Sequence, residues 1–180
     1  GAADRRGVRQ VMIILGIDCG LTGALAALEA RSGELVALHD LPVQRDRSLG
    51  WIDGPELLAM LSAIRNGRPA RAYVERLHAM PRALGGVQAG ISRGLTLGSL
   101  LATLSIAGIG LELVMPGVWK RALGLIAPGA SDADRKRASL DRARLLYPMA
   151  DLERAKDHNR AEAILIAYWA LREWRGADAA

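Results

Sequence analysis

Carboxylate side chains near the ends of apolar segments are the residues of this sequence best suited to chemistry. Asp18 ends the apolar run ILGID, and Glu75 follows the run AYV. Glu162 lies near the start of the apolar stretch AEAILIAYWAL. A buried carboxylate is costly unless it is paired, hydrogen-bonded or bound to a metal ion. We therefore expect these acids to share a partner.

Asp157 and His158 stand just upstream of Glu162 and are candidates for the same site. If the last helix includes His158, that residue shares a face with Glu162 at the i, i+4 spacing. If the helix starts later, Asp157 acts as its N-cap and can fold back toward the same point. Either geometry directs two groups to one place.

Clustered carboxylates repel one another, and a shared proton or a bound cation relieves that repulsion. Oxygen ligands of this kind suit Mg²⁺ and Mn²⁺. Two such ions about 4 Å apart can activate a water molecule and stabilise the leaving oxygen in phosphodiester hydrolysis. The alternative is that Glu75 pairs with Arg76 and that Glu162 pairs with an arginine on a solvated face.

The elements that must position these acids alternate between strands and helices. Apolar runs and turn residues predict five strands, at 11–18, 23–29, 34–41, 71–77 and 111–116. Helices are expected at 53–67, at 88–107, around Trp119, at 132–147 and at 159–174. This order predicts an α/β fold, with a five-stranded mixed sheet flanked by helices and with the first and fourth strands as neighbours.

Two of the expected helices carry more specific predictions. Residues Leu57, Leu58, Leu61 and Ile64 share one apolar face of the first helix, which Asp53 starts and Gly67 stops. The segment 95–111 is borderline in length for a membrane span and is dotted with Gly, Ser and Thr. We predict a buried helix there, with no membrane span and with small residues that permit dimer contacts.

Length and composition favour a single domain that spans residues 1–180. The chain has 180 residues, 51% of them hydrophobic, which is enough for one sizeable core. Its formal net charge of +5 is compatible with a polyanionic partner such as nucleic acid, and equally with a biased genome composition. The single cysteine, Cys19, excludes an internal disulfide and is compatible with a reducing, cytoplasmic setting. Residues 1–10 are predicted to be a flexible segment or a tag remnant.

Four motifs in a fixed order resemble one known family. They are ILGIDCGLTGALA, AYVERLHAMP, MPGVWKRALGL and DHNRAEAILIA. In order and separation they resemble the RuvC-type Holliday junction resolvases, particularly the shorter phage-like branch. The resemblance implies an RNase H-like fold, a cytoplasmic homodimer of bacterial or phage origin, and two Mg²⁺ ions per active site, with Mn²⁺ able to substitute. It implies paired symmetric nicking of four-way DNA junctions in recombination and repair.

The same resemblance assigns roles to particular residues. Asp18 matches the first-strand aspartate that bridges both metals, Glu75 matches the glutamate of the fourth strand, and Glu162 matches a last acid that is more usually aspartate. The fourth ligand stays open between Asp157, which we favour, and His158 as its rival or assistant. Cys19 replaces the usual proline and is taken as a tolerated small residue.

Basic residues near these motifs are candidates for holding DNA. Lys120 is a candidate phosphate contact or active-site cation, and Arg121 follows it. Arg135 and Lys136 belong to a basic run, while Arg82 and Arg93 flank a glycine-rich segment that can reach a junction centre. Such contacts would be independent of sequence and sensitive to salt. Trp119, Tyr168 and Trp169 are predicted to pack in the core.

Two other functions compete with the nuclease. The motif GIDCGLTGA also resembles the phosphate-binding hairpin of actin-like ATPases, but these need a second lobe for which this chain is too short. A non-catalytic or broad-specificity module that binds branched DNA is the other alternative. A module without catalysis predicts a broken acidic set, whereas the carboxylates are present here.

Overall fold

The computed structural model describes residues 11–77, 86–154 and 156–178. Its central sheet contains β1 (Ile13–Asp18), β2 (Ala24–Glu29), β3 (Leu35–Asp40), β6 (Ala70–Glu75) and β7 (Gly110–Val114). The strand order is β3-β2-β1-β6-β7. β2 pairs antiparallel with β1 and β3, whereas β6 pairs parallel with β1 and β7. The predicted five-stranded mixed sheet is confirmed, and the N-terminal segment 1–10 lies outside the described residues.

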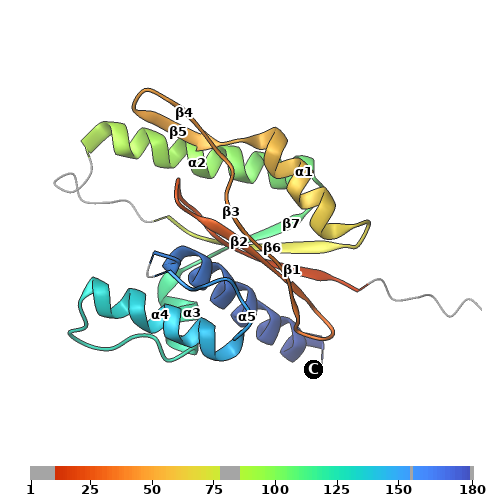
Figure 1. Cartoon of the computed structure of the whole chain (residues 1–180). Coiled ribbons are helices and arrows are strands. Elements are labelled where there is room, and N and C mark those ends of the chain that lie inside the picture. The colour runs from red at the N-terminus through yellow and green to blue at the C-terminus, as the bar shows by residue number, and fades with distance from the viewer. Residues whose placement is uncertain (1–10, 78–85, 155, 179–180) are drawn as a thin grey trace, which may run out of the picture.

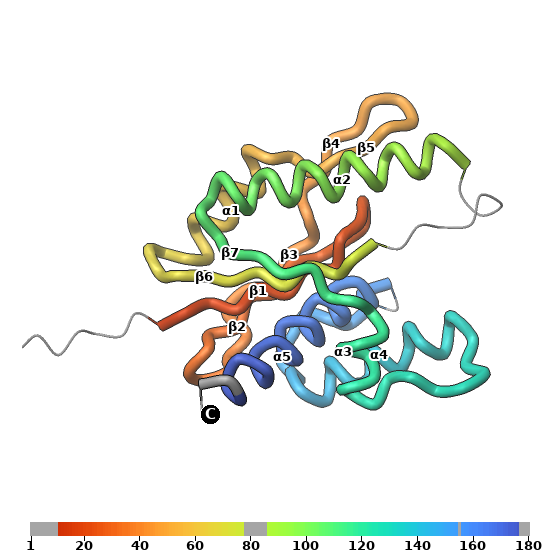
Figure 2. Tube along the Cα trace, turned by 180° about the vertical axis from the view of Figure 1, so that it is seen from behind, coloured from red at the N-terminus to blue at the C-terminus, as the bar shows by residue number. Residues whose placement is uncertain are grey.

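Helices cover both faces of the sheet (Figure 1). One face carries α1 (Gly54–Arg65) and α2 (Gly86–Ile106), and the other carries α3 (Pro116–Ala122), α4 (Asp132–Leu146) and α5 (His158–Asp178). The view from behind shows the same two layers on either side of the strands (Figure 2). Two apolar cores therefore lie back to back, with the sheet between them.

β1 is the strand that both cores share. Ile13, Leu15 and Ile17 face the core under α1 and α2, while Ile14 faces the core under α5. All four side chains are fully buried. A strand buried on both faces reads as a nearly continuous apolar run, which explains the composition of this segment.

A glycine in β1 sets how closely α5 approaches the sheet. A Cβ atom at Gly16 would collide with the backbone of Ala163 and Ala167 in α5. Both alanines are fully buried, so small residues meet on each side of the contact. The helix backbone consequently lies directly against the central strand, and this contact brings the start of α5 to the end of β1.

The predictions for α1 and α2 need correction. Leu57, Leu61 and Ile64 are buried in α1, but Leu58 is 38% exposed. α2 packs through one face only, and Val87 and Ile106 are 80% and 76% exposed. Among the described helices, α2 is the one that length and composition would allow to cross a membrane. The face of α2 opposite its exposed side chains packs on the sheet. The helix ends before a left-handed Gly108, and β7 follows.

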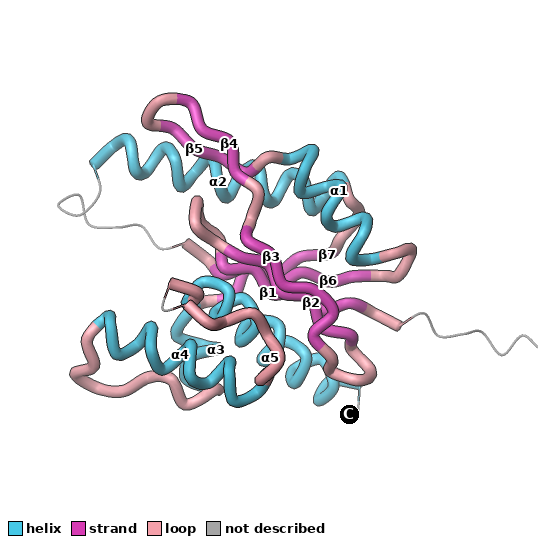
Figure 3. Tube along the Cα trace, in the orientation of Figure 1, coloured by secondary structure: helices cyan, strands magenta, loops and turns pink. Residues whose placement is uncertain are grey.

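A short hairpin of β4 (Val43–Asp46) and β5 (Leu49–Ile52) was not predicted. The hairpin lies along α2 (Figure 3), where the amide of Ile52 donates a hydrogen bond to Ser99 Oγ over 3.1 Å. Its turn contains Arg47 at a φ of 51°. Glycine or asparagine usually marks such a turn, so the sequence contains no ordinary signal for it.

Candidate active site

Two neighbouring parallel strands end in carboxylates. β1 ends at Asp18 and β6 ends at Glu75, and the register pairs Ile17 with Val74. Because the strands run side by side in the same direction, both acids stand at the same edge of the sheet. This is the neighbour relation that the sequence predicted for the first and fourth strands.

The third acid comes from α5. Glu162 lies in the second turn of that helix, which the close contact at Gly16 presses against β1. Asp18, Glu75 and Glu162 each offer an oxygen, and the three oxygens lie within 4.8 Å of one another. We call these residues the acidic triad. The structure therefore brings together three of the four carboxylates that the sequence assigned to one site.

Three hydrogen-bond donors hold the two glutamates of the triad. The indole Nε1 of Trp119 donates to Glu75 Oε2 over 3.0 Å. Lys120 Nζ donates to Glu162 Oε1 over 2.8 Å, and Ser139 Oγ donates to the same oxygen over 3.2 Å. Lys120 is the one cation among these three donors, and it faces three carboxyl groups.

The pKa values of the acids reflect this crowding. Burial raises the pKa of Asp18 to about 8, with further increases from the charges of Glu162 and Glu75 and a smaller opposing effect from Lys120. Burial and the charge of Glu162 also raise the pKa of Glu75, against the effects of Lys120 and of the Trp119 hydrogen bond. A bound divalent cation would relieve both the burial cost and the repulsion. The residues present therefore suit a metal ion.

The segment that follows Asp18 contains a tight turn and a buried cysteine. A Cβ atom at Gly23 would collide with the carbonyl oxygen of Asp18, so this tight turn requires glycine there. Cys19 is buried next to Asp18. Burial raises the pKa of its thiol to about 12, and the charges of Asp18 and Glu75 act in the same direction. A thiol with so high a pKa is a poor nucleophile, which agrees with its interpretation as a small structural residue.

Comparisons with known proteins identify the fold. No model of a known protein family matches this sequence, and no curated protein matches it. The Thermus thermophilus RuvC structure in complex with a Holliday junction substrate matches at a TM-score of 0.62 and 18% identity, covering 92% of this chain and 96% of that chain. The chain has the fold of RuvC. The predicted RNase H-like architecture is thereby confirmed.

Two further solved structures match over similar lengths. A second structure of Thermus thermophilus RuvC aligns with a TM-score of 0.50 at 18% identity, covering 92% of this chain and 97% of that one. The yeast mitochondrial Holliday junction resolvase Ydc2 aligns with a TM-score of 0.49 at 14% identity, covering 91% of this chain and 82% of that one.

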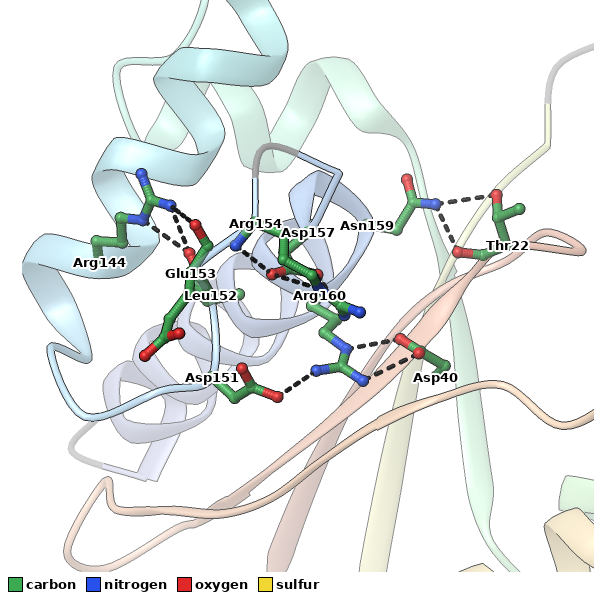
Figure 4. A network of polar contacts seen from close by, with 10 residues as sticks. All are labelled: Thr22, Asp40, Arg144, Asp151, Leu152, Glu153, Arg154, Asp157, Asn159 and Arg160. Atoms are coloured by element: carbon green, nitrogen blue, oxygen red, sulfur yellow. Dashed lines mark hydrogen bonds and ion pairs between the residues drawn. The ribbon is translucent and has the colours of Figure 1, made fainter.

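On this RuvC fold, Asp157 does not join the acidic triad. Its side chain is 2% exposed and turns back toward Arg154, whose amide and guanidinium both donate to it (Figure 4). Burial raises the pKa of Asp157, but the hydrogen bonds and charge of Arg154 more than offset this and leave the pKa below its usual value. The preference for Asp157 as fourth ligand needs correction, because its carboxylate already has a cationic partner.

His158, the rival candidate, is the first residue of α5 and precedes Glu162 by four positions. The two side chains therefore project from the same face of the helix. Burial lowers the pKa of His158, and the charge of Lys136 adds to this effect, against the charges of Glu162 and Asp157. An imidazole close enough to Glu162 to sense its charge is suited to ligating a metal or to accepting a proton.

The predicted DNA-binding residues lie in different surroundings. Lys120 is held by Glu162 at the triad, whereas Arg121 is exposed on α3. Arg93 lines a hollow beside Cys19. Arg135 is exposed and pairs with Asp132 over 3.2 Å, and Lys136 is exposed on the same helix, close enough to influence His158. Arg82 lies outside the described residues.

A polar network around the start of α5 was not predicted. Arg160 bridges Asp40 of β3 and Asp151, at 2.6 Å and 2.7 Å (Figure 4). Asn159 Nδ2 donates to the carbonyl oxygen and the hydroxyl of Thr22, in the turn that follows Asp18. The contacts with Asp40 and Thr22 link residues more than a hundred positions apart, so spacing along the chain carries no signal for them.

Proposed function

We propose that this protein is a divalent-metal-dependent endonuclease that resolves four-way DNA junctions by paired symmetric nicking. One observation carries the proposal: three carboxylates from β1, β6 and α5 converge within 4.8 Å on the RuvC fold, and Lys120 contacts one of them, Glu162. Solved RuvC in complex with a Holliday junction substrate supports branched DNA as the partner. The same proposal takes this protein to be cytoplasmic, to be encoded by a bacterium or a phage, and to belong to the phage-like branch.

Asp18, Glu75 and Glu162 would hold the metal, with His158 as a candidate further ligand. Mg²⁺ is the ion that suits this oxygen set, and Mn²⁺ can replace it. Two such ions would activate water and stabilise the leaving oxygen of a phosphodiester. Burial, together with the charges of Glu162 and Glu75, raises the pKa of Asp18, and a bound metal ion would favour its ionised form.

Other side chains of the site serve the substrate. Lys120 is one-quarter exposed at 25% and can exchange its contact with Glu162 for a phosphate oxygen of DNA. The pKa of His158 is lowered by burial, which favours the form of the imidazole that can accept a proton. Lys136 and Arg121 present exposed charges on the same side of the sheet, where they can contact the phosphate backbone.

Paired nicks require two active sites, so the proposal includes a homodimer. The exposed face of α2 carries Val87, Ile91 and Leu95, with open space around Gly90 and Gly94. Contiguous exposed apolar side chains mark interaction surfaces. We expect Leu95→Glu to shift the sedimentation coefficient from that of a dimer to that of a monomer. A wild-type protein that sediments as a monomer would contradict this part of the proposal.

The decisive experiment compares labelled four-way junctions, forks and linear duplex at matched salt, with Mg²⁺ or with a chelator. We expect paired symmetric nicks on the junction that need Mg²⁺ and disappear in Asp18→Asn. Junction binding without metal-dependent cleavage would replace the nuclease with a binding module. A protein that neither binds nor cleaves any of these DNAs would overturn the nucleic-acid function altogether.

A further inference from the structure

Trp119 belongs to α3 and contacts Glu75 of the acidic triad. Its side chain is fully buried, and α3 lies beside α5 on one face of the sheet (Figure 2). A buried indole N–H usually needs a hydrogen-bond acceptor. Here the acceptor is Oε2 of Glu75, at 3.0 Å, on a strand that is 44 positions away in sequence.

The chemical type of this donor matters for the triad. Lys120 contacts Glu162 with a full positive charge, which cancels part of the negative charge that a cation needs. The indole N–H is neutral, so it fixes Glu75 and leaves the charge of that carboxylate intact. Ser139 Oγ acts in the same way on Glu162, at 3.2 Å. Each glutamate therefore has one neutral donor.

The geometry also indicates what would happen without the indole. Glu75 has a flexible side chain, and it stands next to two other carboxylates that repel it. Among the contacts of the described residues, the Trp119 hydrogen bond is the side-chain donor on Glu75. Removing it would leave repulsion free to rotate Glu75 away from Asp18 and Glu162.

We propose that Trp119 is a positioning residue whose indole N–H holds Glu75 within the acidic triad, so that the three carboxylates present one preorganised cation site. Its effect on DNA cleavage rests on the proposed function, whereas its effect on metal binding does not. The ring has a second role, because Lys120 Nζ lies 4.9 Å from its centroid. A cation at this distance is attracted by the ring face.

The test compares two substitutions of the same chemical type. Trp119→Phe removes the N–H and keeps a ring face for Lys120. Trp169→Phe is the matched control, because Trp169 is also buried in this core, where it packs edge-on against Tyr73 at 6.2 Å. Mn²⁺ binding without DNA is measured by titration calorimetry, and folding is followed by urea denaturation.

We expect Trp119→Phe to weaken Mn²⁺ binding about 10-fold or more, the size expected for a lost hydrogen bond to a charged group. Trp169→Phe is expected to change Mn²⁺ affinity by less than about 2-fold while losing comparable stability. Equal Mn²⁺ affinities in the two variants would overturn the proposal. Wild-type protein that binds Mn²⁺ but cuts no DNA would overturn the proposed function and leave the positioning role standing.

A second measurement covers the case in which Trp119→Phe fails to fold. The chain has four tryptophans, so the ¹⁵N–¹H spectrum contains four indole N–H signals. We expect Glu75→Ala to shift one of them strongly, and Mg²⁺ binding to wild-type protein to shift the same signal. The Trp169 signal, assigned with Trp169→Phe, is the control. A spectrum in which Glu75→Ala moves no indole signal would refute the contact.

Discussion

Two groups of acids meet near the start of α5, and they have opposite environments. In the acidic triad, three carboxylates lie within 4.8 Å of one another, and Lys120 contacts one of them, Glu162. In the network at the start of α5, Asp40, Asp151 and Asp157 share the guanidinium groups of Arg154 and Arg160. The pKa values of Asp18 and Glu75 are raised, whereas those of Asp40 and Asp157 are lowered.

This contrast distinguishes a candidate metal site, the acidic triad, from a structural network of ion pairs. Arginine neutralises a carboxylate and occupies its oxygens with fixed hydrogen bonds, so such an acid has little need of a metal ion. Among the described contacts the triad has no arginine partner, so a bound cation would relieve its repulsion and burial cost. We infer that cation binding at this end of the sheet belongs to the triad, and that the network holds the helix which delivers Glu162.

Substituting one acid in each group should give the largest difference in the rate of junction cleavage. We expect Asp18→Asn to reduce junction cleavage by at least about 1,000-fold, because a central metal ligand is lost. Asp157→Asn should reduce it by less than about 10-fold, because the new amide would still fill the same space beside Arg154. Single-turnover cleavage at saturating Mg²⁺ checks both. An Asp157→Asn variant as inactive as Asp18→Asn would return Asp157 to the list of ligands.

The close contact of α5 with β1 positions the acids of both groups. Disturbing this contact should therefore affect the whole end of the sheet. Gly16→Ala should lower the free energy of unfolding by about 3 kcal/mol, because the new methyl group meets the backbone of Ala163 and Ala167. Gly176→Ala is the control, since that α5 glycine has no neighbouring atom within 4 Å. The control should be stabilised by up to about 1 kcal/mol. Urea denaturation measures both, and equal stabilities would contradict the proposed contact.

Arg154→Ala addresses the network alone. It leaves the carboxylate of Asp157 buried without this cation, which should lower the melting temperature. Mn²⁺ affinity should change little, because the triad has no contact with this arginine among the described ones. Thermal denaturation and Mn²⁺ titration of the same sample test this pairing of effects. A loss of Mn²⁺ binding with unchanged stability would reverse the assignment of the two groups.

The pH dependence of stability should have opposite signs in the two groups. The folded pKa of Asp18 is about 8, against an ordinary value of 3.8, so between these values the folded state binds a proton that the unfolded state releases. The free energy of unfolding of metal-free protein should therefore fall as the pH rises through this window, by at most about 1.4 kcal/mol per pH unit. Asp157 has a lowered pKa, so its contribution is lost as the pH falls below 3.8.

Urea denaturation in a chelating buffer from about pH 4 to about pH 8 measures this slope. Asp18→Asn should flatten it, whereas Asp157→Asn should leave it unchanged in that range. A wild-type stability that rises over the same range would show that Asp18 is ionised in the folded protein without metal.

Several elements could be predicted because their signals are local. The strand meander, the capped α1 and the basic helix α4 follow from apolar runs, turn residues and capping side chains over a few positions. The neighbour relation of β1 and β6 followed from the order of strands and helices. The β4–β5 hairpin was missed because Arg47 occupies a turn position where glycine or asparagine is the usual signal.

The choice between Asp157 and His158 shows where spacing along the chain stops being informative. Both lie within five positions of Glu162, and both geometries were compatible with the sequence. The position of Arg154 decides against Asp157, because its guanidinium lies 2.7 Å from that acid and holds it in the loop. Likewise, a packed Trp119 was predictable, but its hydrogen bond to Glu75 was not.

The sequence by itself determined which segments are strands and helices, which acids are costly to bury, and which family the motifs resemble. These are properties of short stretches, set by side-chain periodicity, turn chemistry and the ionisation of single groups. Only the tertiary structure decided which partner each acid receives. Trp119 and Ser139 contact acids that lie 44 and 23 positions away along the chain, and electrostatic energy depends on the distance in space and not on that separation.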